Sequence, residues 1–130
     1  MTNKKSGNDW EKECLKLLGD NGFFATKLQE KNMGAPFDLI ATKDGIFFAI
    51  ECKKIEKSSK FVLSRIEPNQ RASYKRLLEV NSKNYFFFFD CPDGKYFLDA
   101  KDVILSKNKS IDVKSGEKIE KWFQKVAKKA

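Results

Sequence analysis

The chain has 130 residues, of which 41% are hydrophobic and 34% are charged, and twelve are phenylalanine. This length supports one hydrophobic core and is too short for two, so we expect a single domain over residues 1–130. The apolar content excludes wholesale disorder. The 26 lysines and arginines against 18 acidic residues give a net charge of +8. This charge favours a polyanionic partner through counterion release from phosphates.

The sequence contains no histidine, which excludes His-dependent triads, HEXXH zinc sites and a histidine general base. The three cysteines, Cys14, Cys52 and Cys91, lack metal-ligand spacing, so we expect reduced, structural thiols. The N-terminus has no signal-peptide core, and no segment approaches the roughly 18 apolar residues of a membrane span. We therefore expect a soluble cytoplasmic protein whose hydrolytic chemistry, if any, depends on carboxylates and a metal.

The first part of the chain predicts one helix followed by three strands. Ser6 or Asn8 can cap a helix that ends at Gly19 or at residues 21–22, since its apolar residues recur at helical spacing. Residues 1–6 would then form a flexible basic tail. Period-two patterns and turn residues predict strands at 23–28, 36–41 and 46–54, a polar loop at 29–34 and a tight turn at 43–45.

The second part of the chain predicts helices around a buried hairpin. Pro68 fits the first turn of a helix that runs to about Val80, after a charged loop at 54–60 and a short extended segment at 61–63. The apolar run 85–89 is typical of a central strand covered on both faces. The remaining expected elements are a turn at 91–94, a strand at 95–98, a short helix at 99–105, a polar connection at 106–114 and an amphipathic helix at 115–129.

The strand at 46–54 carries the clearest functional signal, because a carboxylate and an ammonium group interrupt an apolar run. Glu51 and Lys53 are two residues apart, so they project from the same face, and Cys52 points away. One group can face a metal and the other a phosphate or water. A structural interpretation stands beside this one: a solvent-facing ion pair at 51 and 53, a turn cap at Asp38 and a solvated side chain at Glu11.

The order helix with Glu11, strand with Asp38, hairpin and strand with Glu51-x-Lys53 resembles the PD-(D/E)xK nuclease superfamily. Residues 7–18 look like the first helix of archaeal Holliday junction resolvases. Residues 61–71 are similar to the segment after the catalytic strand in RecU-type resolvases, where Gln70 matches a residue that would position water or phosphate. One residue separates Pro36 from Asp38, a departure from a strict Pro-Asp pair. The resemblance covers residues 7–90 and implies an α/β restriction-endonuclease-like core, with a mixed central sheet of about five strands flanked by helices.

This resemblance implies an endonuclease that uses Mg²⁺, for which Mn²⁺ would substitute. Asp38 and Glu51 would bind the metal, joined by Glu11 and by the backbone carbonyl of Cys52. Lys53 would orient the attacking water or stabilise charge on the phosphate. The implied catalytic residues are Glu11, Asp38, Glu51, Lys53 and Gln70.

Basic residues around the predicted site are candidates for contacts with DNA phosphates, although they could also form an ordinary solvated face. They are Lys4, Lys5, Lys27, Lys54, Lys57, Lys60, Arg65, Arg71 and Lys75. The function we expect is Holliday junction resolution in recombination or repair. A homodimer would place two sites on two strands of branched DNA. The alternatives are another PD-(D/E)xK nuclease, of restriction or mobile-element type, and a non-catalytic basic DNA-binding module.

Overall fold

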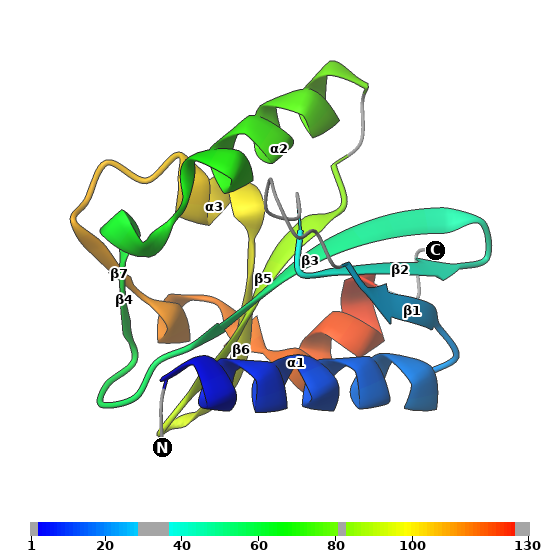
Figure 1. The fold of residues 1–130 in the computed structure, drawn as a ribbon, viewed down its shortest axis with the longest axis horizontal. Helices are drawn as coiled ribbons and strands as arrows, with labels where there is room; N and C mark the ends of the chain where they lie inside the picture. Colours follow the sequence, from blue (N-terminus) through cyan, green and yellow to red (C-terminus); the bar gives the residue numbers. More distant parts are fainter. Residues whose placement is uncertain (1–2, 29–36, 81–82, 127–130) are drawn as a thin grey trace.

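A mixed six-stranded sheet forms the centre of the protein in the computed structural model, which describes residues 3–28, 37–80 and 83–126 (Figure 1). In spatial order its strands are β1 (Phe24–Lys27), β2 (Leu39–Lys43), β3 (Ile46–Lys54), β5 (Tyr85–Cys91), β6 (Gly94–Asp99) and β8 (Glu117–Lys118). Two further short strands, β4 (Lys60–Val62) and β7 (Ser110–Asp112), pair antiparallel with each other. The predicted α/β class is confirmed, with six strands in the main sheet.

The parallel pair β3 and β5 lies in the middle of the sheet and is joined by the helix α2 (Pro68–Glu79). All other neighbouring strands of the sheet are antiparallel. Residues 85–89 are all buried, as predicted for a central strand covered on both faces. The register places Glu51 opposite Phe87 and Lys53 opposite Phe89, so the polar end of β3 lies beside the phenylalanine run.

The tight turn between β2 and β3 is the predicted one. Asp44 has φ of 53° and Gly45 has φ of 80°, both in the left-handed region. A two-residue hairpin turn of this kind matches the right-handed twist of the strands, and aspartate and glycine tolerate positive φ better than other residues.

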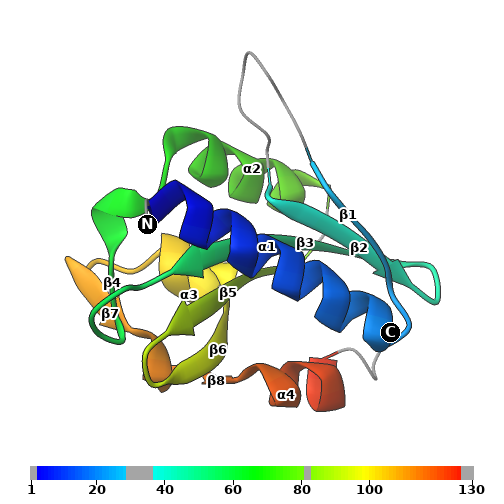
Figure 2. The same cartoon turned by 60° about the horizontal axis from the view of Figure 1, so that its bottom comes forward.

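Helix α1 (Asn3–Asp20) covers one face of the sheet, together with α4 (Ile119–Lys121) and a π-helical turn (Trp122–Val126) (Figure 2). The Trp10 indole donates a hydrogen bond of 3.0 Å to the carbonyl of Phe88 and so ties α1 to β5. We call the buried residues of this face the α1-side core: Trp10, Cys14, Leu18, Phe23, Leu39, Ala41, Phe48, Ile50, Cys52, Phe86, Phe88, Ile119 and Trp122.

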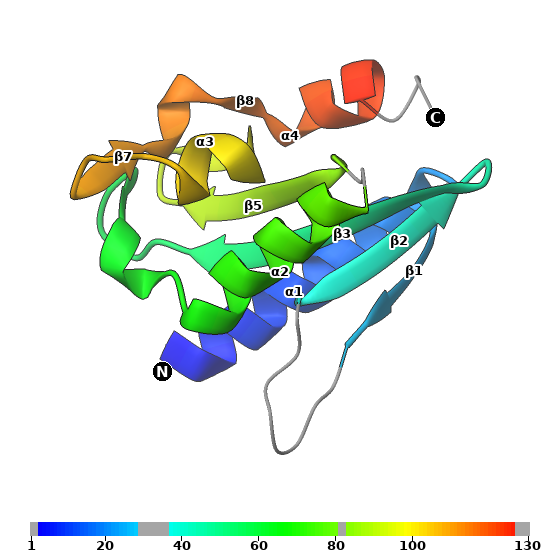
Figure 3. The same cartoon turned by 90° about the horizontal axis from the view of Figure 1, so that it is seen from above.

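The other face is covered by α2, by α3 (Ala100–Ile104) and by the β4–β7 pair with its 3-10 turns at Leu63–Arg65 and Val113–Ser115 (Figure 3). Its buried residues form the α2-side core: Ala49, Ile55, Phe61, Leu63, Ile66, Tyr74, Tyr85, Phe87, Phe89, Cys91, Tyr96, Leu98, Ala100, Val103, Ile104 and Val113. Successive β3 residues therefore alternate between two separate cores. In the part of the chain that the structure describes, no helix is long and apolar enough to cross a membrane.

The N-terminal half differs from the sequence prediction at two element boundaries. Helix α1 begins at Asn3, upstream of the predicted caps Ser6 and Asn8. Residues 3–6, predicted as part of a flexible tail, are therefore helical, and no proline interrupts the helix there. Strand β2 begins at Leu39, so Asp38 lies immediately before the strand and not within it. The predicted loop at 29–34 and residue 36 lie outside the described residues.

The C-terminal region differs more, because pairing with distant strands replaces the predicted loop and helix. Residues 110–112 form β7, which pairs with β4, inside the segment predicted as a polar connection. Residues 117–118 pair with β6, so the helix predicted from 115 begins only at Ile119. Gly116 makes this pairing possible, since a Cβ atom there would lie 2.2 Å from the carbonyl oxygen of Phe97.

Substituting Gly116→Ala should therefore destabilise the fold, because the clash is with backbone and no side chain can relieve it. We expect a loss of about 1–3 kcal/mol in the free energy of unfolding, measured by urea denaturation. The matched control is Gly19→Ala in α1, where nothing lies within 4 Å of the added Cβ atom. The control should stabilise the protein slightly, by about 0.5 kcal/mol or more. Equal stability of the two variants would contradict the close approach at Gly116.

Candidate active site

A pocket of about 390 Å³ opens beside the C-terminal end of β3. Its lining residues come from α1, from the residue before β2, from β3 and from the segment that follows β3. They are Glu11, Asp38, Cys52, Lys53, Lys54, Glu56 and Arg65. The fold thus brings three of the five predicted catalytic residues to one concave surface, although they lie far apart in the sequence.

Glu51 is buried on the α2 side of β3, with only 1% of its surface exposed. Its Oε1 atom accepts a hydrogen bond of 3.1 Å from the Tyr85 hydroxyl, and its Oε2 atom accepts one of 2.8 Å from Gln70 Nε2. Burial raises the pKa of Glu51 well above its ordinary value, and the charge of Asp38 raises it further, while Lys53 lowers it. Both hydrogen-bond donors to Glu51 are neutral, so Lys53 balances the negative charge of this carboxylate only in part.

Asp38 is held against the backbone of β3. Its Oδ2 atom accepts a hydrogen bond of 2.8 Å from the N–H of Cys52, the residue between Glu51 and Lys53. Its own carbonyl accepts a bond of 3.0 Å from the N–H of Leu28, at the end of β1. The carboxylate is therefore held from β3 and the backbone of Asp38 from the end of β1, and neither bond involves a cationic group.

Glu11 reaches the pocket from α1 and forms an ion pair of 2.9 Å with Lys27 Nζ. Burial raises the pKa of Glu11, Lys27 opposes that effect, and the charge of Asp38 adds to it. Asp38 thus raises the pKa of both other carboxyl groups, Glu11 and Glu51. The three groups create a local negative potential that a cation would relieve.

The predicted metal ligands fit a hard cation through their chemistry. Among residues 3–28, 37–80 and 83–126, no three acidic or cysteine side chains are grouped so as to hold a metal on their own. The Cys52 N–H donates to Asp38, and the charge of Asp38 raises the pKa of Glu51, so these three residues lie together. Mg²⁺ accepts carboxylate and carbonyl oxygens, keeps several waters and is commonly bound through one or two carboxylates. Two carboxylates therefore suit this ion, with Glu11 engaged by Lys27 at the edge of the pocket.

Gln70 does two things at the start of α2. Its Oε1 atom accepts a hydrogen bond of 3.1 Å from the N–H of Glu67 in a capping box, and its Nε2 atom donates to Glu51. Only 5% of its surface is exposed. The residue thus couples the beginning of a helix to the orientation of the buried carboxylate.

Tyr85 is the second donor to Glu51, and sequence reasoning missed it. It is the first residue of the apolar run at 85–89 and looks like ordinary core there. The available signal was its phenol hydroxyl, since a buried Tyr normally needs a hydrogen-bond partner. Burial raises the pKa of Tyr85, and the charge of Glu51 raises it further, so the hydroxyl is the donor in this pair.

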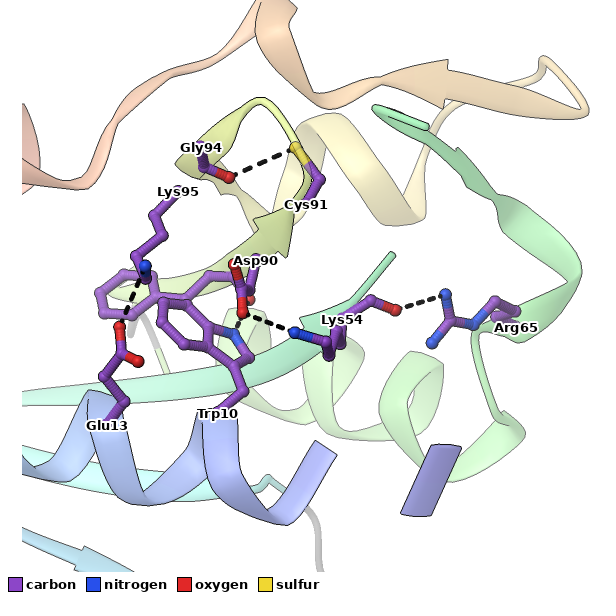
Figure 4. Close-up of polar contacts among 9 residues, drawn as sticks. Trp10, Glu13, Lys54, Arg65, Asp90, Cys91, Gly94 and Lys95 are labelled. Atoms are coloured by element: carbon purple, nitrogen blue, oxygen red, sulfur yellow. Dashed lines mark hydrogen bonds and ion pairs between the residues drawn. The ribbon is translucent and has the colours of Figure 1, made fainter. Parts of the chain in front are cut away.

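Two basic residues of the pocket lining, Lys54 and Arg65, are held by contacts with their neighbours. Lys54 Nζ pairs with Asp90 Oδ2 at 3.0 Å, and the Lys54 carbonyl accepts a hydrogen bond of 3.0 Å from Arg65 Nη1 (Figure 4). The Arg65 guanidinium also lies over the ring of Phe61, 5.3 Å from its centroid. Glu13 and Lys95 are not part of the pocket lining and form an ion pair of 3.3 Å beside Trp10 (Figure 4).

The other basic candidates have different environments. Lys27 pairs with Glu11, and Arg71 donates a hydrogen bond of 2.9 Å to the carbonyl of Ile104. Lys57, Lys60 and Lys75 are exposed, and Lys4 and Lys5 belong to the first turns of α1. Of the nine predicted DNA-binding residues, Lys54 and Arg65 line the pocket itself.

Comparisons with known proteins identify a family and a relative of this chain. A family model described as archaeal Holliday junction resolvase (hjc) matches residues 2–84. A UPF0102 protein from Fervidobacterium nodosum is 32% identical over 106 residues, which cover 78% of this chain and 73% of that protein. The resemblance to Holliday junction resolvases predicted from the sequence is confirmed.

Two solved structures share the fold. The Holliday junction resolvase Hjc of Archaeoglobus fulgidus has a TM-score of 0.68 and 17% identity, covering 90% of this chain and 99% of that chain. The bacterial homing endonuclease I-Ssp6803I has a TM-score of 0.60 and 12% identity, covering 98% of this chain and 97% of that chain. Both likenesses support the predicted restriction-endonuclease-like core.

The crowding of carboxylates predicts that Asp38→Asn stabilises the metal-free protein. Because the pKa of Glu51 is raised in the folded state, the free energy of unfolding falls as the pH rises from about 4.5 through that raised pKa. Removing the Asp38 charge should lessen this fall and add on the order of 1 kcal/mol at pH 7. The gain should vanish at a pH where both carboxyl groups are protonated.

Chemical denaturation with a chelator present measures this difference. The matched control is Asp44→Asn, in an exposed turn whose positive φ asparagine tolerates, and its stability should equal that of the wild type. A gain in the control as large as that in Asp38→Asn would contradict the electrostatic explanation.

Proposed function

Because this chain belongs to the archaeal Holliday junction resolvase (Hjc) family, we propose that it is a metal-dependent DNA endonuclease that cuts four-way junctions. One observation carries the proposal: the buried Glu51, held by two neutral donors, lies close enough to Asp38 and Lys53, which line the pocket, for their charges to shift its pKa. A non-catalytic DNA-binding domain would have no use for a carboxylate buried without a cationic hydrogen-bond partner. The proposed metal is Mg²⁺, with Mn²⁺ as a substitute.

The predicted catalytic residues would have separate roles in phosphodiester hydrolysis. Asp38, Glu51 and the Cys52 carbonyl would hold the metal, with Glu11 completing the site or binding through water. When bound, Mg²⁺ would activate water and stabilise negative charge at the phosphate. Lys53 lines the pocket, and its ammonium group would contact the scissile phosphate and stabilise the charge that develops there.

The surface around the pocket would bind the DNA backbone. The net charge of +8 and the basic residues Lys54 and Arg65 in the pocket lining support phosphate contacts, which position the DNA without reading its sequence. We include in this surface Lys4, Lys5, Lys27, Lys54, Lys57, Lys60, Arg65, Arg71 and Lys75. The chain would act as a single nuclease domain in a homodimer, so that two sites make symmetric cuts in recombination or repair.

A cleavage assay tests the proposed function. Labelled synthetic four-way junctions and linear duplexes of matched sequence are incubated with wild type or Asp38→Asn, with and without Mg²⁺. We expect symmetric, Mg²⁺-dependent cuts in the junction and a loss of roughly 100-fold or more in the variant. Equal cutting of linear duplex would assign another DNA nuclease activity. Tight binding without cleavage would assign the non-catalytic module.

The Lys53 proposal makes a separate prediction about catalysis against binding. Lys53→Ala should lower kcat for junction cleavage roughly 100-fold or more, since it removes a charge that acts mainly on the transition state. The matched control is Lys57→Ala, an exposed lysine in the segment after β3. It should weaken DNA binding modestly, reduce the salt dependence of binding by about one ion and leave kcat at saturating DNA unchanged. A similar kcat for both variants would argue against the role of Lys53.

A further inference from the structure

Tyr85 contacts Glu51 from the α2-side core and does not line the pocket. It pairs with Ala49 in the parallel register of β3 and β5, two residues before Glu51 on the same face of the sheet. Two residues of a strand span roughly 6.6 Å, about the reach of a tyrosine side chain. Its hydroxyl accordingly ends 3.1 Å from Glu51 Oε1, and only 2% of the residue is exposed.

Both donors to Glu51, Tyr85 and Gln70, are neutral groups. Each carboxylate oxygen receives one hydrogen bond from them and has a second acceptor position. Neutral donors fix the side chain without cancelling its charge, whereas an arginine or lysine would. The arrangement therefore orients a carboxylate and leaves its charge for a cation.

The ring of Tyr85 makes a second connection, to the residue before Asp38. The Phe37 and Tyr85 rings meet edge to face, with centroids 5.2 Å apart and an interplanar angle of 72°. Phe37 is also packed against Phe47, at 6.4 Å. Such pairs contribute beyond their buried area. The extra residue between Pro36 and Asp38 thus has a packing role at the entry to β2.

We propose that Tyr85 is a positioning residue for the metal-binding pair. Its hydroxyl holds Glu51 directly, and its ring, through Phe37, holds the chain that presents Asp38. One buried side chain would then set the distance between the two carboxylates. This inference rests on the proposed function, in that it assigns a cation to Asp38 and Glu51.

The test separates the two contacts. Tyr85→Phe removes the hydroxyl and keeps the ring, whereas Phe37→Leu keeps apolar bulk and removes the aromatic edge. The matched control is Tyr96→Phe, a buried tyrosine of β6 that neither bonds to Glu51 nor lines the pocket. Mn²⁺ binding is measured by titration calorimetry without DNA, thermal unfolding with a chelator present, and junction cleavage at saturating DNA.

We expect Tyr85→Phe and Phe37→Leu each to weaken Mn²⁺ binding by roughly 10-fold or more, as loss of a residue that supports a ligand typically does. Cleavage at subsaturating metal should fall in parallel, and Tyr96→Phe should match the wild type. Wild-type affinity for Mn²⁺ in Tyr85→Phe would overturn the inference and leave the proposed function intact. A wild-type protein that binds no Mn²⁺ would overturn both. If Tyr85→Phe failed to fold, Phe37→Leu with wild-type affinity would overturn the inference.

Discussion

The parallel pairing of β3 with β5 is the contact on which the rest of this structure depends. Both strands are central, so their side chains must fill a core on each face, and five consecutive aromatic residues at 85–89 supply much of that volume. The pairing also sets the register that brings Tyr85 to Glu51. Helix α1 is attached to the same pair through the bond from Trp10 to the Phe88 carbonyl. The positions of the residues around the pocket at the end of β3 therefore depend on the most buried part of the sheet.

A buried carboxylate beside a second one is unfavourable for the protein alone, and the structure limits this penalty without removing it. Two neutral hydrogen bonds satisfy Glu51, and one backbone N–H satisfies Asp38, but no cation bonds to either group among the contacts of the described residues. An unsatisfied buried acceptor would be far more costly than these satisfied ones. The remaining electrostatic repulsion is the property that makes the pair suitable for a divalent ion, so stability and proposed activity oppose each other at this site.

The elements that were predicted correctly are those that depend on residues close together in the sequence. The strand at 46–54, the turn at 43–45 and the helix that begins at Pro68 match the structure because periodicity, turn residues and proline act over a few positions. Non-local pairing explains the failures. Residues 110–112 and 117–118 become strands only because β4 and β6 have free edges beside them, and Gly116 permits the close approach. The prediction that Cys52 points away from Glu51 is confirmed, since Cys52 lies in the α1-side core and Glu51 bonds to Tyr85 of the α2-side core. The hydroxyl of Tyr85 signals a buried hydrogen bond, but its partner Glu51 could not be predicted, because the pair depends on the register between distant strands.

The separation of the two cores has a spectroscopic consequence. Both tryptophans of the chain, Trp10 and Trp122, lie in the α1-side core, and all three tyrosines, Tyr74, Tyr85 and Tyr96, lie in the α2-side core. Tryptophan emission therefore reports on the layer that holds α1, and tyrosine emission reports on the layer that holds α2. Energy transfer from tyrosine to tryptophan must run across the sheet. A loss of this energy transfer would show that the two layers have separated. The native chromophores therefore distinguish the unfolding of one face from that of the other without an introduced label.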